Sequence, residues 1–183
     1  LHFCPPNLHK VAFFPGSSVG NFEPREAITF LQRVAEMVGT GGGLLIGVDL
    51  QKDADILNAA YNDKEGFTEK FNKNLLIRIN RELGADFNIE QFEHRAFYNE
   101  EKHRIEMHLV SLQEQQVAIG EHLFRFTKGQ SIVTEYSHKY TVENFTELAG
   151  KAGFECVKTW MDEDQLFSVF YLSVIDQADN DQA

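Results

Sequence analysis

The stretch from Val11 to Pro24, VAFFPGSSVGNFEP, constrains the fold most strongly. An apolar run ends at Pro15, a loop of small residues follows, and an amphipathic helix begins at Pro24. This order predicts a buried strand, a tight loop and a helix. Ligands of open α/β sheets bind beyond the carboxyl ends of the strands, so the loop is a candidate binding site.

Small residues in this loop would let backbone N–H groups approach a ligand, and Asn21 offers both a donor and an acceptor. An ordinary strand-to-helix turn, in which Asn21 helps to cap the helix, is the alternative. After the helix, which is expected to end at Val38, the apolar run GLLIGVDL at 43–50 is typical of a parallel strand covered on both faces. Strand, helix and strand together predict a βαβ unit.

The composition narrows the class of protein. The chain of 183 residues is long enough for one domain with its own core. A net charge of −11, without any Lys/Arg run, argues against binding of nucleic acid or of an anionic membrane. No apolar stretch approaches the ~20 residues that span a bilayer, and residues 1–10 lack the pattern of a secretory signal. Cys4 and Cys156 form no CxxC motif, so we expect reduced thiols, no metal site and a cytoplasmic protein.

Two helices are expected after the βαβ unit. Asp53 is placed to cap a short helix that runs to Tyr61. A longer helix is expected to begin with Thr68 as its cap and to end at Gly84. Its polar face, which includes Asn72, is expected to be solvated. The spacing of its apolar residues predicts an inward face made of Phe71, Leu75, Leu76, Ile79 and Leu83.

From about Glu93 to Tyr140 the apolar residues alternate, which predicts a series of short antiparallel strands. In the last of them Glu135 and Ser137 stand two apart, so their side chains point to one face. A buried carboxylate beside a hydroxyl would indicate a polar binding site, whereas on a solvated face the pair would carry no function. A helix capped by Thr141, two more strands and a disordered tail at 175–183 complete the expected fold.

Six stretches carry a resemblance to a known family. They are FFPGSSVGN at 13–21, LLIGVDLQKD at 44–53, AYND at 60–63, FNKNLLIRINRELGADF at 71–87, HRIEMHL at 103–109 and TEYSHKY at 134–140. In this order and spacing they resemble the histidine Nα-methyltransferases of ergothioneine biosynthesis. Those enzymes use S-adenosylmethionine to trimethylate the α-amino group of histidine.

The resemblance implies an α/β fold of the S-adenosylmethionine-dependent methyltransferase (Rossmann-like) kind. Residues 1–174 would be the C-terminal part of that domain, with an antiparallel insertion at about 93–140 that forms the substrate pocket. Gly16 would lie in the loop that approaches the cofactor, S-adenosylmethionine. No residue is implied as a covalent catalyst.

The resemblance also implies a set of substrate residues. They are Asn21 at the backbone end of the amino acid, Tyr61 at its carboxylate, Glu135 and Ser137 at the imidazole ring, and Met107 in the wall of the side-chain pocket. Without the resemblance, Tyr61 would be interpreted as a half-buried helix residue and Met107 as plain core packing.

The sequence departs from the family in two ways. It has no glycine-rich loop followed by an acidic strand end, and its first strand matches the fourth strand of the family's sheet. We therefore expect a C-terminal part of a longer enzyme, inactive alone, with an exposed sheet edge that favours a homodimer. The second departure is Ser17, which stands where family members often have a second glycine.

Two alternative functions stay open. Relatives of this family methylate amino acids that carry an indole ring, although an indole has little use for the carboxylate of Glu135. The other alternative is a non-catalytic module that binds an amino acid or serves as a scaffold while another chain supplies the cofactor half.

Overall fold

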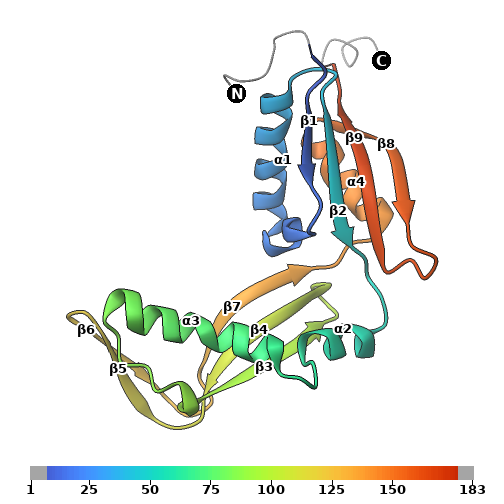
Figure 1. Ribbon diagram of the computed structural model, residues 1–183. Coiled ribbons are helices and arrows are strands. Elements are labelled where there is room, and N and C mark those ends of the chain that lie inside the picture. The colour runs from blue at the N-terminus through green and yellow to red at the C-terminus, as the bar shows by residue number, and fades with distance from the viewer. Residues whose placement is uncertain (1–7, 177–183) are drawn as a thin grey trace. The chain divides into compact units, whose positions relative to one another are not determined.

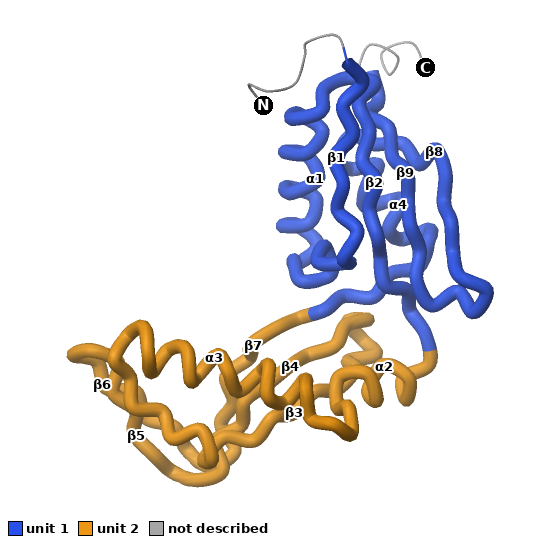
Figure 2. The backbone as a smooth tube through the Cα atoms, viewed as in Figure 1, with its two compact units in different colours: residues 1–52, 137–183 blue, residues 53–136 orange. Residues whose placement is uncertain are grey.

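The computed structural model describes residues 8–176, so Cys4 and residues 177–183 of the expected tail lie outside the described part. Two compact units make up the chain (Figure 2). Unit 1 comprises residues 1–52 and 137–183, and unit 2 comprises residues 53–136. Between residues 8 and 176, no helix has the length and apolar character needed to cross a membrane.

Unit 1 is built on a four-stranded sheet in the order β1-β2-β9-β8 (Figure 1). Strands β1 and β2 are parallel, and β9 is antiparallel to both of its neighbours. The predicted βαβ unit is confirmed, and so are the two predicted strands at the end of the chain, which pair with each other as β8 and β9. The elements are β1 (Val11–Phe14), η1 (Ser18–Asn21), α1 (Pro24–Val38), β2 (Gly43–Asp49), α4 (Val142–Lys151), β8 (Phe154–Met161) and β9 (Phe167–Val174).

Helices α1 and α4 pack on one face of this sheet, and their buried side chains join those of β2 and β9 in one core. Phe145 of α4 and Phe170 of β9 lie at its centre, with ring centroids 4.8 Å apart. Asn21 does not cap α1. Glu23 is the N-cap, and its carboxylate and that of Glu26 bond reciprocally to backbone N–H groups.

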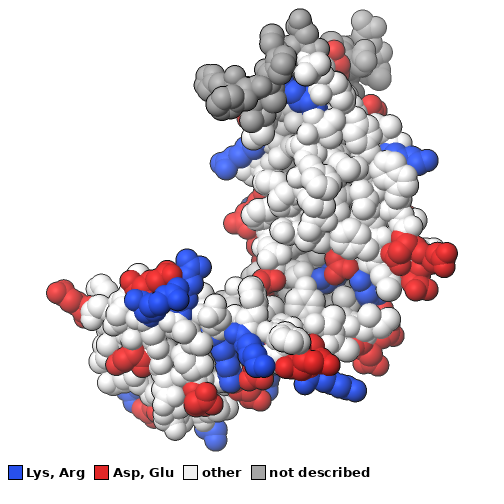
Figure 3. Space-filling model, viewed as in Figure 1, with Lys and Arg blue, Asp and Glu red and all other residues white. Residues whose placement is uncertain are grey.

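The opposite face of the sheet carries no helix of unit 1 in the described part of the chain (Figure 1). The expectation of a buried first strand is wrong, because β1 is the edge strand and Phe13 is 69% exposed. Leu45 of β2 is only half-buried, so β2 is covered on one face rather than two. In Figure 3 this side of unit 1 is a broad area without charged groups.

Unit 2 contains the predicted antiparallel strands. They form a three-stranded sheet in the order β3-β4-β7 and a two-stranded ribbon of β5 and β6. The last two residues of β7 belong to unit 1. The elements are α2 (Ala54–Tyr61), α3 (Phe67–Leu83), η2 (Ile89–Gln91), β3 (Phe92–Asn99), β4 (Arg104–Ser111), β5 (Gln115–Ile119), β6 (His122–Phe126) and β7 (Ser131–His138).

Helix α3 differs from its prediction in its N-cap residue and in the residues that form its buried face. Thr68 is not the cap: the N-cap is Gly66, and the Asp63 carboxylate accepts from the N–H groups of Phe67 and Thr68 at 2.7 and 2.8 Å. Of the expected inward residues, Leu76 is fully buried and Ile79 packs on the same core, whereas Phe71, Leu75 and Leu83 are exposed. Asn72, expected in solvent, is 3% exposed.

The Asp63 cap makes the stability of unit 2 depend on pH. Hydrogen bonds to Thr68 and Phe67 lower the pKa of Asp63 from 3.8 to about 2. The pKa is lower in the folded state, so the stabilisation is complete above about pH 4 and is lost as pH falls towards 2. Urea unfolding should show Asp63→Ala less stable than wild type at pH 7, with a difference that shrinks between pH 4 and 2. Asp164→Ala, in an exposed turn, is the control, and a pH-independent deficit in Asp63→Ala would contradict the prediction.

Candidate functional site

The loop between β1 and α1 lies at the carboxyl end of β1, where the sequence pattern placed it. Its backbone is pressed against two other segments of unit 1. A Cβ atom on Gly47 of β2 would lie 2.1 Å from the carbonyl oxygen of Pro15. One on Gly20 would lie 2.7 Å from the carbonyl oxygen of His138. Both glycines therefore permit a backbone approach that no other residue would allow.

Two of the predicted site residues lie in this loop. Gly16 is exposed, and a Cβ atom there would meet nothing closer than Ser18 Oγ at 3.7 Å. Asn21, the last residue of η1, is also exposed. A ligand could reach both residues from solvent without displacing the packed side of the loop.

A network of charged and polar groups lies at the carboxyl end of β2. The Asp49 carboxylate accepts from Lys52 Nζ at 2.5 Å and from Lys139 Nζ at 2.6 Å. The same Lys139 ammonium donates to Ser137 Oγ at 2.9 Å. The backbone N–H of Asp49 donates to Ser17 Oγ at 2.8 Å, which ties the network to the loop after β1.

Strand pairing explains how residues far apart in sequence meet in this network. Leu50 and Tyr140 form an isolated parallel bridge, and the Gln51 N–H donates to the Tyr140 carbonyl at 2.9 Å. Segment 137–140 is thereby held beside the end of β2. Burial, with a smaller effect from the Glu23 carboxylate, raises the pKa of Tyr140 to about 12, so its hydroxyl stays neutral at physiological pH.

Unit 2 holds a cavity of about 200 Å³ between α3 and its sheet. Met107 and Glu135, two of the predicted substrate residues, both contribute to its wall. Met107 is 2% exposed and Glu135 is half-buried, so a carboxylate and an apolar wall meet here. The lining residues are Phe71, Asn72, Asn74, Leu75, Arg78, Met107, Thr134 and Glu135.

Tyr61, at the end of α2, packs half-buried against the apolar cluster that contains Met107. The structure thus brings Tyr61, Met107 and Glu135 into one neighbourhood of unit 2. Gly16, Asn21 and Ser137 lie in unit 1. Ser137 is 6% exposed, so it is not on a solvated face of β7.

A second polar network, whose residues were not predicted as site residues, lies on β4. Glu106 accepts from Arg104 Nε at 2.9 Å, and its other oxygen lies 3.3 Å from His108 Nε2. The Arg104 guanidinium stacks 3.5 Å from the ring centre of Tyr136. Burial raises the pKa of Glu106, but hydrogen bonds from Arg104, His108 and Asn99 outweigh it and hold the pKa below its ordinary value. In the stretch HRIEMHL the charged residues alternate with apolar ones, and this alternation indicates that the charged side chains share one face of the strand.

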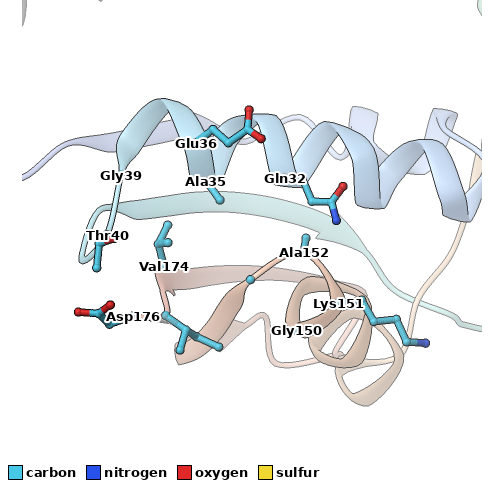
Figure 4. A pocket seen from close by; sticks show the side chains of 12 residues that line it. Gln32, Ala35, Glu36, Gly39, Thr40, Gly150, Lys151, Ala152, Val174 and Asp176 are labelled. Carbon is cyan, nitrogen blue, oxygen red and sulfur yellow. The ribbon is translucent and has the colours of Figure 1, made fainter. Parts of the chain in front are cut away.

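A larger cavity, about 760 Å³, lies at the other end of unit 1, between the C-terminal ends of α1 and α4 (Figure 4). Glu36, Lys151 and Asp176 are its charged residues, and Lys151 pairs with Glu147 at 2.7 Å. None of the predicted site residues lines it. It is remote from the carboxyl ends of β1 and β2, where ligands of such sheets bind.

Comparison with known proteins decides the family. A family model described as histidine-specific methyltransferase, SAM-dependent, matches residues 3–174. The chain belongs to this family. The resemblance drawn from the six stretches is confirmed, and so is the α/β methyltransferase fold class.

Histidine-specific methyltransferases are also among its curated relatives. The chain is 37% identical to a histidine N-alpha-methyltransferase of Mycolicibacterium smegmatis, covering 84% of this chain and 48% of that protein. It is 37% identical to that of Mycobacterium tuberculosis, covering 87% and 50%. An L-tryptophan methyltransferase of Psilocybe serbica is 29% identical, with coverage of 91% and 48%. The chain spans about half the length of these relatives.

The cofactor of this family is S-adenosylmethionine, and its predicted contact in this chain, Gly16, lies in the loop after β1. The exposed backbone at Gly16 leaves space for a ligand at the carboxyl end of β1. The sequence has no glycine-rich loop followed by an acidic strand end. Gly16 therefore stays the one predicted contact with the cofactor, and the other predicted site residues are of the kind that bind an amino acid.

Proposed function

We propose that this chain is the substrate-holding part of an S-adenosylmethionine-dependent N-methyltransferase that acts on the α-amino group of histidine, and that it works in the cytoplasm. The observation that carries the proposal is the match of the histidine-specific family model to residues 3–174. The meeting of Met107 and Glu135 at one cavity supports it, because an imidazole needs both an apolar wall and a hydrogen-bond acceptor.

Each predicted substrate residue has a role in this proposal. Glu135 accepts a hydrogen bond from a ring N–H, and Ser137 contacts the second ring nitrogen. Met107 packs against the ring, Tyr61 holds the carboxylate, and Asn21 orients the amine. These residue types bind and position the substrate, and none of them is needed as a nucleophile.

The chemistry requires orientation more than covalent catalysis. The cofactor, when bound, supplies a methyl group that is already activated as a sulfonium. The attacking amine must be neutral and in line with the transferred carbon. Asn21, at the end of η1 and exposed to ligands, is suited to hold the amine in that direction.

Calorimetric titration tests the proposal. The protein is titrated with histidine, N,N-dimethylhistidine and tryptophan, each with and without S-adenosylhomocysteine. Selective binding of the two imidazole ligands is the expected result. Equal or tighter binding of tryptophan would favour the indole alternative, which the Psilocybe serbica relative suggests. Amino-acid binding without methyl transfer, measured on the protein in its full natural length, would favour a non-catalytic module.

Self-association belongs to the proposal as well. Val11, Phe13, Leu45 and Tyr171 are neighbours in the register of the sheet and share its uncovered face. Such an apolar face beside an unpaired edge favours pairing with a second copy.

Sedimentation velocity of the 183-residue chain should therefore show a dimer, and Phe13→Lys should shift it to monomer. Phe67→Lys, at a phenylalanine of equal 69% exposure on α3, is the matched control. A wild-type monomer at all concentrations would contradict this prediction.

A further inference from the structure

Asn72 is a buried amide on the side of α3 that packs against the sheet of unit 2. It is 3% exposed, and Leu76, one turn further along the helix, is fully buried in the apolar core. Burial of an amide costs free energy unless its polar atoms find partners. Asn72 finds them in the His94 ring of β3 and in the His108 backbone of β4, so one side chain joins α3 to two strands.

These contacts decide which atoms of Asn72 and His94 carry hydrogen. The His108 carbonyl oxygen can only accept, so the Asn72 atom 3.1 Å from it must be the amide nitrogen, Nδ2. The same NH₂ group donates to His94 Nδ1 at 2.9 Å. His94 Nε2 lies 3.0 Å from the Tyr61 carbonyl oxygen and must donate to it. His94 is therefore a neutral imidazole with its hydrogen on Nε2.

The bond from His94 holds the last residue of α2, which is Tyr61. Asn58 and Asn62 also bond to the backbone of β3 and dock the helix along that strand. The His94 bond acts at Tyr61 itself. Because the backbone carbonyl of Tyr61 makes this bond, it is compatible with any contact of the Tyr61 side chain. All of these contacts lie within unit 2.

We propose that His94 is a positioning residue that places Tyr61 for the carboxylate of the substrate amino acid. This inference rests on the proposed function, in which Tyr61 holds that carboxylate. Asn72 keeps the His94 ring in the tautomer that can donate to the Tyr61 carbonyl. Asn72 and Met107 also line the same cavity, so one network sets the carboxylate end of the site and the wall of the side-chain pocket.

A double-mutant cycle in the protein of full natural length tests this inference. In the described part of the chain His94 does not line the cavity, so His94→Phe leaves the cavity wall in place while it removes both ring nitrogens. We expect His94→Phe to raise KM for histidine about fivefold, with kcat at saturation nearly unchanged. In a Tyr61→Phe background the same substitution should raise KM by less than about twofold, because its effect passes through Tyr61.

Two further variants serve as controls for the cycle. His94→Gln keeps both a donor and an acceptor in the side chain, so it should recover part of the loss. His122→Phe makes the same change at an exposed histidine of β6 in the same unit, and it should behave as wild type.

Nitrogen NMR of the wild type with isotope-labelled histidine rings gives a measurement that needs no variant. His94 should show the neutral tautomer with hydrogen on Nε2 at neutral pH. A charged ring, or the tautomer with hydrogen on Nδ1, would overturn the inference, because Nδ1 could then not accept from Asn72.

The outcomes separate this inference from the proposed function. A wild-type protein that neither binds nor methylates histidine would overturn both. If the wild type methylates histidine but the losses of His94→Phe and Tyr61→Phe add in the double variant, the role of His94 alone is overturned, because additive losses indicate independent effects. An unchanged KM in either single variant would have the same meaning. If His94→Phe does not fold, His94→Leu takes its place in the cycle with the same expected result.

Discussion

Glu135→Ala should weaken histidine binding between about tenfold and a hundredfold, because it leaves a ring N–H in the substrate pocket without its acceptor. Glu135 is half-buried at the cavity that Met107 also lines, so water replaces the lost carboxylate poorly. Binding of S-adenosylhomocysteine should not change. Isothermal titration of the variant with both ligands measures the two affinities.

Glu121→Ala provides the control for this experiment, because Glu121 is an exposed carboxylate in the turn between β5 and β6 of the same unit. Glu121→Ala changes the net charge by the same amount as Glu135→Ala, and it should leave histidine binding intact. Equal histidine affinities in wild type and Glu135→Ala would remove Glu135 from the substrate site.

Gly47→Ala should produce the largest loss of stability. The added methyl group would lie 2.1 Å from the Pro15 carbonyl oxygen and 2.8 Å from the Phe167 ring, and the backbone atom cannot rotate away. Overpacking of this kind costs about 3 kcal/mol. The clash can be relieved by displacement of the loop after β1. Gly16 and Asn21 should move with this loop, so ligand binding should fall as well.

Urea unfolding followed by tryptophan fluorescence measures this effect, because Trp160, the single tryptophan, lies on β8 of unit 1. Gly150→Ala is the matched control. Gly150 lies within α4 with no atom near an added Cβ, so alanine there should stabilise the protein by about 0.5–1 kcal/mol. A Gly47→Ala variant as stable as wild type would show that the loop is not held against β2.

Local signals in the sequence predicted most elements of the fold. Helix α1 runs from Pro24 to Val38 as predicted, because proline at its start and glycine after its end act through their own backbone preferences. The Asp53 cap of α2 is confirmed for the same reason. The burial of β1 could not be predicted, because an apolar run reads the same in a central strand and in an edge strand. The exposure of Phe71 could not be predicted either, because its apolar side chain is 68% exposed beside a cavity rather than packed in the core.

Some residues of the candidate site could be predicted from the sequence, and others could not. Family motifs pointed to Met107 and Glu135, and the structure places both at one cavity. The partners of Ser137 were not predicted. Lys139 and Asp49 are 90 residues apart and meet only because the chain returns beside the end of β2, which no local pattern encodes.

The bridge between Leu50 and Tyr140 places the exit from unit 1 and the return to it at neighbouring points. An insertion with adjoining ends can be lengthened, trimmed or exchanged while the sheet that carries it keeps its pairing. During synthesis the same arrangement sets an order of events. Strand β2 leaves the ribosome before unit 2, but its partner β9 follows only after unit 2 is complete. Unit 2 therefore has the opportunity to fold while the larger sheet still waits for its last strands.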